Sequence, residues 1–304
     1  MKPSNRLGRG ACVCLRAAVA AVLLTLMALP AGAGSEARSK GTYTTVDVPG
    51  AIQTVVSGLN DAGQVCGTAY MPNGVFGFVG DPSTGSYTTF QVPGTGSFTN
   101  AYGINNAGTT VGQYDDASGF GHAFIRTAQG AFTTFDVPDG SDAAAFGIDG
   151  TGAVVGDYYP IGGGALTGFV RSPGGTFTSI TPPGATASTA YGISAKGFIV
   201  GGEFSGSQWH GYVRSSTGAF STFDVPGASM TFARGIKKAG TVVGDAHING
   251  VDTGFSRSRK GKFRMIVPPG AVQALASAIN GKGLIAGSFT DGSGVNHGFL
   301  YSKK

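Results

Sequence analysis

The chain has 304 residues, of which 41% are hydrophobic and only 12% are charged, so it can bury a core and is not a disordered protein. Its 54 glycines are spread along the whole sequence and exclude an all-helical fold, because each glycine inside a helix costs about 1 kcal/mol. Four of the 21 basic residues lie within positions 1–33, and the remaining 17 nearly balance the 16 acidic residues, which argues against a nucleic-acid-binding protein.

The first 33 residues have the pattern of a secretory signal peptide. Basic residues precede an apolar run over residues 17–30, and small residues follow it. The run is shorter than the ~20 residues that span a bilayer, so a membrane anchor is the weaker alternative. We expect a signal peptide over residues 1–33, cleaved near Ala33, and a short linker over residues 34–40. The mature protein would then be secreted, periplasmic or at the cell surface, with no membrane span.

From residue 41 onward the sequence repeats six times, and residues 41–304 make up six units of 44 residues. A proline recurs every 43 to 45 residues, and a glycine recurs with nearly the same period. The prolines are Pro49, Pro93, Pro138, Pro183, Pro226 and Pro269, and the glycines are Gly67, Gly112, Gly156, Gly201, Gly244 and Gly287. We expect a single repeat domain over residues 41–304.

Each unit contains four short runs of β-branched and aromatic residues separated by glycine or proline, and in the second unit these are residues 101–105, 109–114, 122–126 and 132–137. The first two runs are separated by a segment that ends in glycine, typical of a type I turn between antiparallel strands. Four antiparallel strands per unit, repeated six times, predict an all-β fold, a six-bladed β-propeller. A β-solenoid is the alternative, but its strands pair between coils and not through hairpins.

The order of the runs predicts how the ring closes. The mature chain begins with residues 43–48, which are equivalent to a fourth run, and ends with residues 299–301, which are equivalent to a third run. We therefore expect the N-terminal strand to be the outermost strand of the last blade, which removes an open sheet edge.

The second unit reads Gly-His-Ala-Phe-Ile-Arg at 121–126 and Phe-Asp-Val-Pro at 135–138. This resembles the HAF repeat of secreted bacterial proteins, which is named for its His-Ala-Phe triplet. The resemblance covers all six units, although only this unit has the full triplet. The family carries no established activity, so the resemblance implies an exported repeat protein and names no catalytic residue.

The recurring polar residues predict no metal site and no cofactor. The repeated histidine is replaced by threonine in two units, and threonine cannot coordinate zinc, so a structural hydrogen bond is favoured over metal binding. Asp47, Asp136 and Asp224 are expected to accept hydrogen bonds from the backbone at a strand end. Cys66 stands where other units have valine or alanine, which predicts a buried small side chain.

Residues that differ between units concentrate where the second-to-third loops and the connections between blades share one face of the ring. Aromatic residues there either contact a ligand or pack between blades, and their periodicity favours packing. The candidate ligand-binding residues are Tyr114, Asp115, Asp116, Tyr158, Tyr159, Trp209, His247 and Asp291.

We expect a monomeric binding scaffold for an extracellular glycan or protein, and no nucleic-acid partner. One alternative is a propeller enzyme, such as a glycan hydrolase, a lyase or a lactonase, that uses Asp115, Asp116, Asp291 and His247. Another is a structural cell-surface protein. The basic residues between 234 and 264 are expected to form a solvated face.

Overall fold

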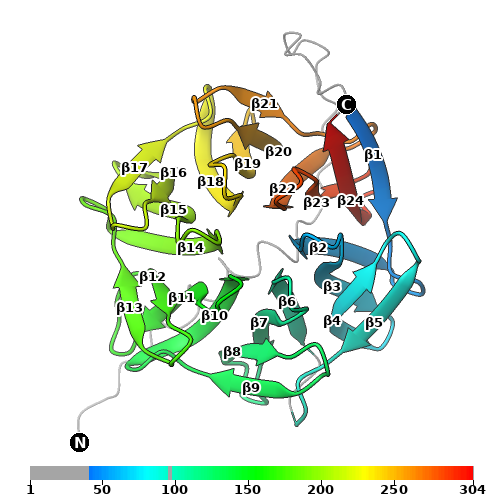
Figure 1. Ribbon diagram of the computed structural model, residues 1–304, viewed down its shortest axis with the longest axis horizontal. Coiled ribbons are helices and arrows are strands. Elements are labelled where there is room, and N and C mark those ends of the chain that lie inside the picture. The colour runs from blue at the N-terminus through cyan, green and yellow to red at the C-terminus, as the bar shows by residue number, and fades with distance from the viewer. Residues whose placement is uncertain (1–40, 95–97, 304) are drawn as a thin grey trace, which may run out of the picture. The chain divides into compact units, whose positions relative to one another are not determined.

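The structure is a computed structural model that describes residues 41–94 and 98–303. These residues form six antiparallel sheets of four strands each, which stand in chain order around a ring (Figure 1). The predicted all-β, six-bladed β-propeller is therefore confirmed. The predicted signal peptide, its cleavage site and the linker lie outside the described residues.

Five blades are continuous in the chain, and the first strand of each is the innermost (Figure 1). Blade 1 consists of β2 (Gln53–Leu59), β3 (Val65–Met71), β4 (Gly74–Asp81) and β5 (Ser86–Phe90). Blade 2 consists of β6 (Thr99–Ile104), β7 (Thr110–Asp115), β8 (Gly121–Arg126) and β9 (Phe132–Phe135). Blade 3 consists of β10 (Gly140–Ile148), β11 (Val154–Pro160), β12 (Thr167–Arg171) and β13 (Phe177–Ile180). Blade 4 consists of β14 (Ala187–Ile193), β15 (Ile199–Ser205), β16 (Gln208–Arg214) and β17 (Phe220–Phe223). Blade 5 consists of β18 (Ala228–Ile236), β19 (Val242–Ile248), β20 (Val251–Arg257) and β21 (Phe263–Met265).

Blade 6 is built from both ends of the described chain. Its first three strands are β22 (Gln273–Ile279), β23 (Ile285–Thr290) and β24 (Asn296–Lys303), and its outermost strand is β1 (Gly41–Val46). Strand β1 pairs antiparallel with β24, from Gly41 opposite Lys303 to Val46 opposite Gly298. Val46 and Val48 also pack into the hydrophobic cluster of blade 1. The predicted closure by the N-terminal strand is confirmed.

The first turn of each blade explains why a glycine recurs there. In blade 1 the Asn60 side chain accepts hydrogen bonds from the amides of Ala62 and Gln64, at 3.1 and 3.0 Å. Gly63 donates to the Asn60 carbonyl at 3.1 Å and has a φ of +94°, a left-handed conformation that favours glycine. The Asn60 side chain also donates to the carbonyl of Asn105 in the next blade, at 3.2 Å, so the turn joins neighbouring blades.

The repeated glycine of the second strand has a different cause. A Cβ atom at Gly112 would collide with the carbonyl oxygen of Asn100 and lie 2.7 Å from the Phe124 ring. The same collision with a backbone carbonyl occurs at the other five glycines of this series. The aromatic rings that cover them are fully buried and form the core of each blade: Phe78, Phe124, Phe169, Tyr212, Phe255 and Phe299.

Alternating strand directions divide the connections of each blade between two faces of the ring. The face that carries the loops between second and third strands and the connections between blades is called the loop face. Its described segments are 47–52, 72–73, 91–94, 98, 116–120, 136–139, 161–166, 181–186, 206–207, 224–227, 249–250, 266–272 and 291–295. We call the opposite one the turn face, and its segments are 60–64, 82–85, 105–109, 127–131, 149–153, 172–176, 194–198, 215–219, 237–241, 258–262 and 280–284.

Candidate functional site on the loop face

The loop face carries the exposed apolar side chains of the described residues. The four large hydrophobic residues that are exposed are Ile52 (60%), Phe120 (50%), Ile161 (70%) and Val272 (44%). Each belongs to a loop-face segment. Single exposed apolar residues are ordinary, but their restriction to one face of a ring points to an interaction surface.

The charge of the loop face is acidic. Nine aspartates lie in its segments or at the strand ends beside them: Asp47, Asp115, Asp116, Asp136, Asp139, Asp142, Asp224, Asp252 and Asp291. The described segments of this face contain no lysine or arginine, and Arg264 in β21 is the one basic residue as close to them as these aspartates. The four histidines of the chain also lie at loop-face ends of strands. The face therefore favours a partner that offers positive charge.

Each histidine pairs with one of these aspartates. The Nδ1 atoms of three repeat histidines bond the aspartate that precedes Val-Pro, directly after the fourth strand of the same blade: His122 with Asp136 at 2.7 Å, His210 with Asp224 at 2.9 Å, and His297 with Asp47 at 3.0 Å. His247 bonds Asp252 on the neighbouring strand at 2.8 Å. The structural hydrogen bond predicted for the repeat histidine is confirmed.

The partner found for the repeat aspartates differs from the backbone donors expected from the sequence. At the closing strand the carboxylate of Asp47 bonds the His297 side chain, and the next backbone amide, that of Val48, donates to the Thr54 hydroxyl at 3.0 Å. The threonine satisfies the strand end, which leaves the carboxylate for the imidazole on the adjacent strand.

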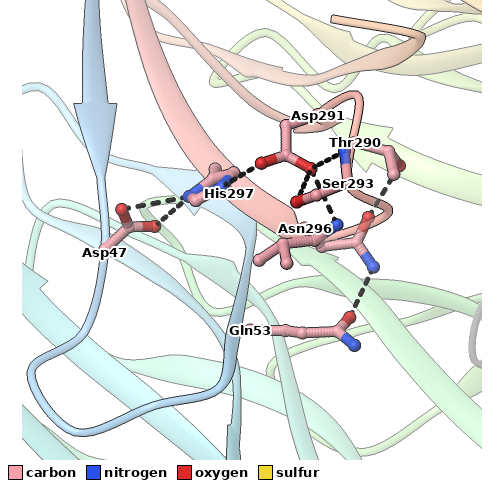
Figure 2. A network of polar contacts seen from close by, with 8 residues as sticks. Asp47, Gln53, Thr290, Asp291, Ser293, Asn296 and His297 are labelled. Atoms are coloured by element: carbon pink, nitrogen blue, oxygen red, sulfur yellow. Dashed lines mark hydrogen bonds and ion pairs between the residues drawn. The ribbon is translucent and has the colours of Figure 1, made fainter.

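In blades 2 and 6 a second carboxylate contacts the other nitrogen of the ring. His297 Nε2 lies 3.4 Å from Asp291 Oδ2, and Asp291 Oδ1 accepts the amides of Ser293 and Val295 at 2.8 and 2.9 Å (Figure 2). His122 Nε2 lies 3.4 Å from Asp116 in the same way. Since carboxylates contact both nitrogens, neither ring is placed to activate a hydroxyl or thiol nucleophile.

In blade 2, hydrogen bonds to carboxylates shift the pKa of His122. Burial lowers the pKa of His122, but the hydrogen bonds and charges of Asp136 and Asp116 outweigh it, and the net pKa is raised. The backbone amide of Phe120 is the largest of the effects that lower the pKa of Asp116. The carboxylate of Asp116 therefore stays ionised at neutral pH, and the imidazole takes up a proton more readily than a free histidine.

A small pocket of about 160 Å³ opens beside His122, between blades 2 and 3. Asp116, Asp136 and Asp142 line it together with the half-exposed ring of Phe120. Asp142 accepts the amide of Gly121 from blade 2 at 3.0 Å, so the two blades are joined at the pocket. Three carboxylates beside one apolar ring can accept hydrogen bonds from hydroxyl or amino groups while the ring covers an apolar surface.

Another pocket, of about 470 Å³, lies against the closing strand. Tyr43, Pro268, Pro269, Phe289 and Phe299 contribute to its lining. None of the eight ligand-binding residues predicted from the sequence belongs to it.

Three of the predicted aromatic residues, Tyr114, Tyr158 and Trp209, make packing contacts. The Tyr114 ring stacks on His122 with centroids 5.3 Å apart. The Tyr158 hydroxyl lies 3.2 Å from the Ser179 hydroxyl, and its ring packs into a cluster between blades. Trp209 contacts Phe204 and Phe232 with ring centroids 5.7 and 5.4 Å apart. These contacts are those expected of the packing alternative, and ligand binding by these rings stays a prediction.

The other predicted residues lie at the loop face but do not gather at one point. The Asp115 amide donates to the carbonyl of Phe98 at 3.3 Å, and the Tyr159 carbonyl accepts the Ser141 hydroxyl at 3.3 Å. His247 bonds Asp252, and Asp291 caps its own loop. Among the eight predicted residues, Asp116 alone lines the pocket beside His122.

The sequence prediction missed the rest of this pocket, although one signal was present. The repeat histidine and the aspartate before Val-Pro occur in the same three units and are both replaced in the other three. Joint replacement of two side chains within a repeat indicates contact. Within the described part of the chain, no three His, Cys, Asp or Glu side chains are placed to hold a metal ion.

No protein-family model and no curated protein matches the chain. Among solved structures, TolB from Acinetobacter baumannii has a TM-score of 0.55 at 17% identity, covering 70% of this chain and 54% of TolB, so the chain spans about half of TolB. A catalytically inactive virginiamycin B lyase from Staphylococcus aureus with quinupristin has a TM-score of 0.51 at 12% identity, covering 86% of this chain and all (100%) of the lyase. The propeller domain of the trilobed protease from Pyrococcus furiosus, which has an open velcro topology, has a TM-score of 0.52 at 9% identity, covering 84% and 80%. These identities show the fold alone. In the described residues, no helix is both long and apolar enough to cross a membrane.

Proposed function

We propose that this protein is an exported, monomeric binding protein that uses its loop face to hold an extracellular partner. The signal-type N-terminal sequence and the resemblance to the HAF-repeat family support export. The observation that carries binding is the gathering on one face of the exposed apolar residues and nine aspartates, without a lysine or arginine in its described segments.

A protein partner suits this face better than a glycan. Three of the four exposed apolar residues, Ile52, Ile161 and Val272, are aliphatic. Aliphatic side chains pack against apolar protein surface, whereas sugar rings are usually bound on aromatic ones. The carboxylates around them would pair with lysine or arginine of the partner.

A glycan is the second candidate, and the pocket beside His122 supports it. Its volume of about 160 Å³ and its combination of Phe120 with three carboxylates suit a single sugar residue. An enzyme remains an alternative in which Asp115 and Asp116 act on the bound glycan, and a structural cell-surface role is another alternative.

The test uses a variant altered only at exposed loop-face positions. Phe120→Ser and Ile161→Ser remove apolar contacts, and Asp139→Asn removes a charge at a position whose φ of +56° asparagine tolerates. We expect the protein to bind members of an array of basic, apolar peptides, and the triple variant to bind at least tenfold more weakly. The matched control replaces Lys238, Lys260 and Lys282 on the turn face by glutamine and should bind these peptides as the wild type does.

Two outcomes contradict loop-face binding of a protein. Equal peptide binding by the loop-face variant and the wild type would remove the loop face from the interaction. Absence of peptide binding together with selective binding on a glycan array would assign the face to a glycan instead.

A further inference from the structure

The turn face is basic in one half of the ring only. Its segments in blades 1 to 3 contain Asp61 and Asp149 and no lysine or arginine. Its segments in blades 4 to 6 contain no acidic residue and seven basic ones: Lys196, Lys237, Lys238, Arg259, Lys260, Lys262 and Lys282. The loop face is therefore acidic, and the basic residues of the turn-face segments are confined to blades 4 to 6.

Three turns that carry six of these residues lie next to one another. A Cβ atom at Gly240 would lie 3.5 Å from the Arg259 side chain, so the turn at 258–262 lies against the turn at 237–241. A Cβ atom at Gly283 would lie 3.4 Å from Lys237 Nζ, which places this ammonium group beside the first turn of blade 6. We call these three turns the basic surface, and its cations are Lys237, Lys238, Arg259, Lys260, Lys262 and Lys282.

The cations of the basic surface have no carboxylate partner among the described residues. Among the described residues, the ion pair that involves a lysine or arginine is the one between Arg234 and Asp245, which lies within blade 5 and outside the basic surface. Asp61 lies at the edge of the surface: a hydrogen bond from Asn106 is the largest cause of its lowered pKa, and the charge of Lys282 also contributes. Asp61 also accepts the amide of Gly281 at 2.6 Å. Six cations with so little neutralisation repel one another and attract a polyanion.

The side chains of the basic surface indicate which class of polyanion it can bind. Stable binding to a membrane surface combines basic residues with apolar side chains that enter the lipid, and the exposed large hydrophobic residues of the described chain all lie on the opposite face. Single-stranded nucleic acid is held by bases stacked on aromatic rings, and the three turns expose no large aromatic side chain. A flexible anionic chain that is recognised by its repeated charges requires neither exposed apolar side chains nor exposed aromatic rings.

We propose that the basic surface binds an anionic polysaccharide, a chain whose repeated carboxylate or sulfate groups pair with the exposed lysines and arginine of blades 5 and 6. This site is separate from the loop face and takes a partner of opposite charge. The ring can then hold a polyanion on one face and a cationic partner on the other.

The test measures binding of the protein to polygalacturonate and to heparin between 50 and 300 mM salt. Lys238→Gln, Lys260→Gln and Lys282→Gln remove one exposed charge from each turn, and the control variant replaces the same three lysines by arginine. We expect at least a tenfold weaker affinity and a shallower salt dependence for the glutamine variant, and wild-type behaviour for the arginine variant. The loop-face triple variant should bind both polysaccharides normally, which separates this site from the proposed loop-face function.

A solvated face without a partner predicts no binding of either polysaccharide at 50 mM salt, and that result would overturn the proposal. Equal binding by the glutamine variant and the wild type would do the same. Tighter binding to single-stranded DNA or to phosphatidylglycerol vesicles than to both polysaccharides would assign the surface to another class of partner.

Discussion

At the residue scale, an arginine near the end of the third strand joins neighbouring blades. The Arg126 guanidinium lies 4.5 Å from the ring centroid of Phe90 in blade 1 and 5.9 Å from that of Phe132 in its own blade. Its Nε atom has no hydrogen-bond partner, and burial lowers the pKa of the side chain. This mostly buried cation is stabilised by the two aromatic rings and by the Thr127 carbonyl, which accepts a hydrogen bond from Nη1 at 3.3 Å.

Arg214 provides a matched comparison, because the preceding blade offers Ile180 where blade 1 offers Phe90. Arg214 contacts one ring, that of Phe220, at 5.9 Å. We expect Arg126→Ala to lower the free energy of unfolding by about 2 kcal/mol and Arg214→Ala by less than about 1 kcal/mol. Urea unfolding of the two variants measures the difference, and equal losses would show that the inter-blade ring contributes nothing.

The histidine and aspartate pairs predict a dependence of stability on pH. Burial lowers the pKa of His122, yet the bonded carboxylates raise it overall, so the folded protein holds the proton more tightly than the unfolded chain. This stabilisation is complete below about pH 6.5, the pKa of an unperturbed histidine, and is lost as the pH rises through the higher folded-state pKa.

Replacing Asp136 by asparagine tests this assignment. Asp136→Asn keeps the size of the side chain and removes its charge, so the pKa of His122 should fall and the loss of stability above pH 6.5 should become smaller. Titration of the histidine signals by NMR measures the pKa directly. His210, which bonds Asp224 in blade 4, is the internal control and should titrate as in the wild type. An unchanged His122 titration would refute the effect of Asp136.

At the element scale, the repeats made the fold predictable. Turn glycines and alternating apolar positions recur every 43 to 45 residues, so each strand of one blade supports the assignment of the equivalent strand in the next. The phase of the repeat also predicted that β1 closes blade 6, because a chain that starts with a fourth strand and ends with a third must share a sheet. In the second unit the strands begin and end within two residues of the predicted runs.

The candidate site was less predictable, because it depends on contacts that do not recur from one repeat unit to the next. The pocket beside His122 requires Asp142 of blade 3 to reach the amide of Gly121 in blade 2, which it does with a φ of +50°. Neither this left-handed conformation nor the exposure of Phe120 recurs in the other units as a pattern. The contact of His297 with Asp47 joins positions 250 residues apart in sequence, and ring closure alone brings them together.

At the scale of the whole molecule, the chain could be circularly permuted at any blade. The stability of a permutant should depend on whether the new ends lie within a blade or between two blades. Gly41 lies opposite Lys303, so in a protein reduced to residues 41–303 a five-residue linker like the turn at 172–176 can join these two positions. Opening the joined chain between Gly174 and Gly175 makes β13 the first strand and β12 the last, so blade 3 closes the ring as blade 6 does now. Opening it between Pro183 and Gly184 leaves two complete blades in contact, with no strand shared across the seam.

We expect the first permutant to unfold at nearly the urea concentration of the natural chain. The second should be less stable by about 2–4 kcal/mol, the usual effect of losing a covalent constraint across a long chain, because inter-blade packing alone then holds its ends together. Both permutants carry the same linker and the same composition, so their difference isolates the shared strand. Equal unfolding midpoints would mean that packing between blades, and not the pairing of β1 with β24, keeps this ring closed.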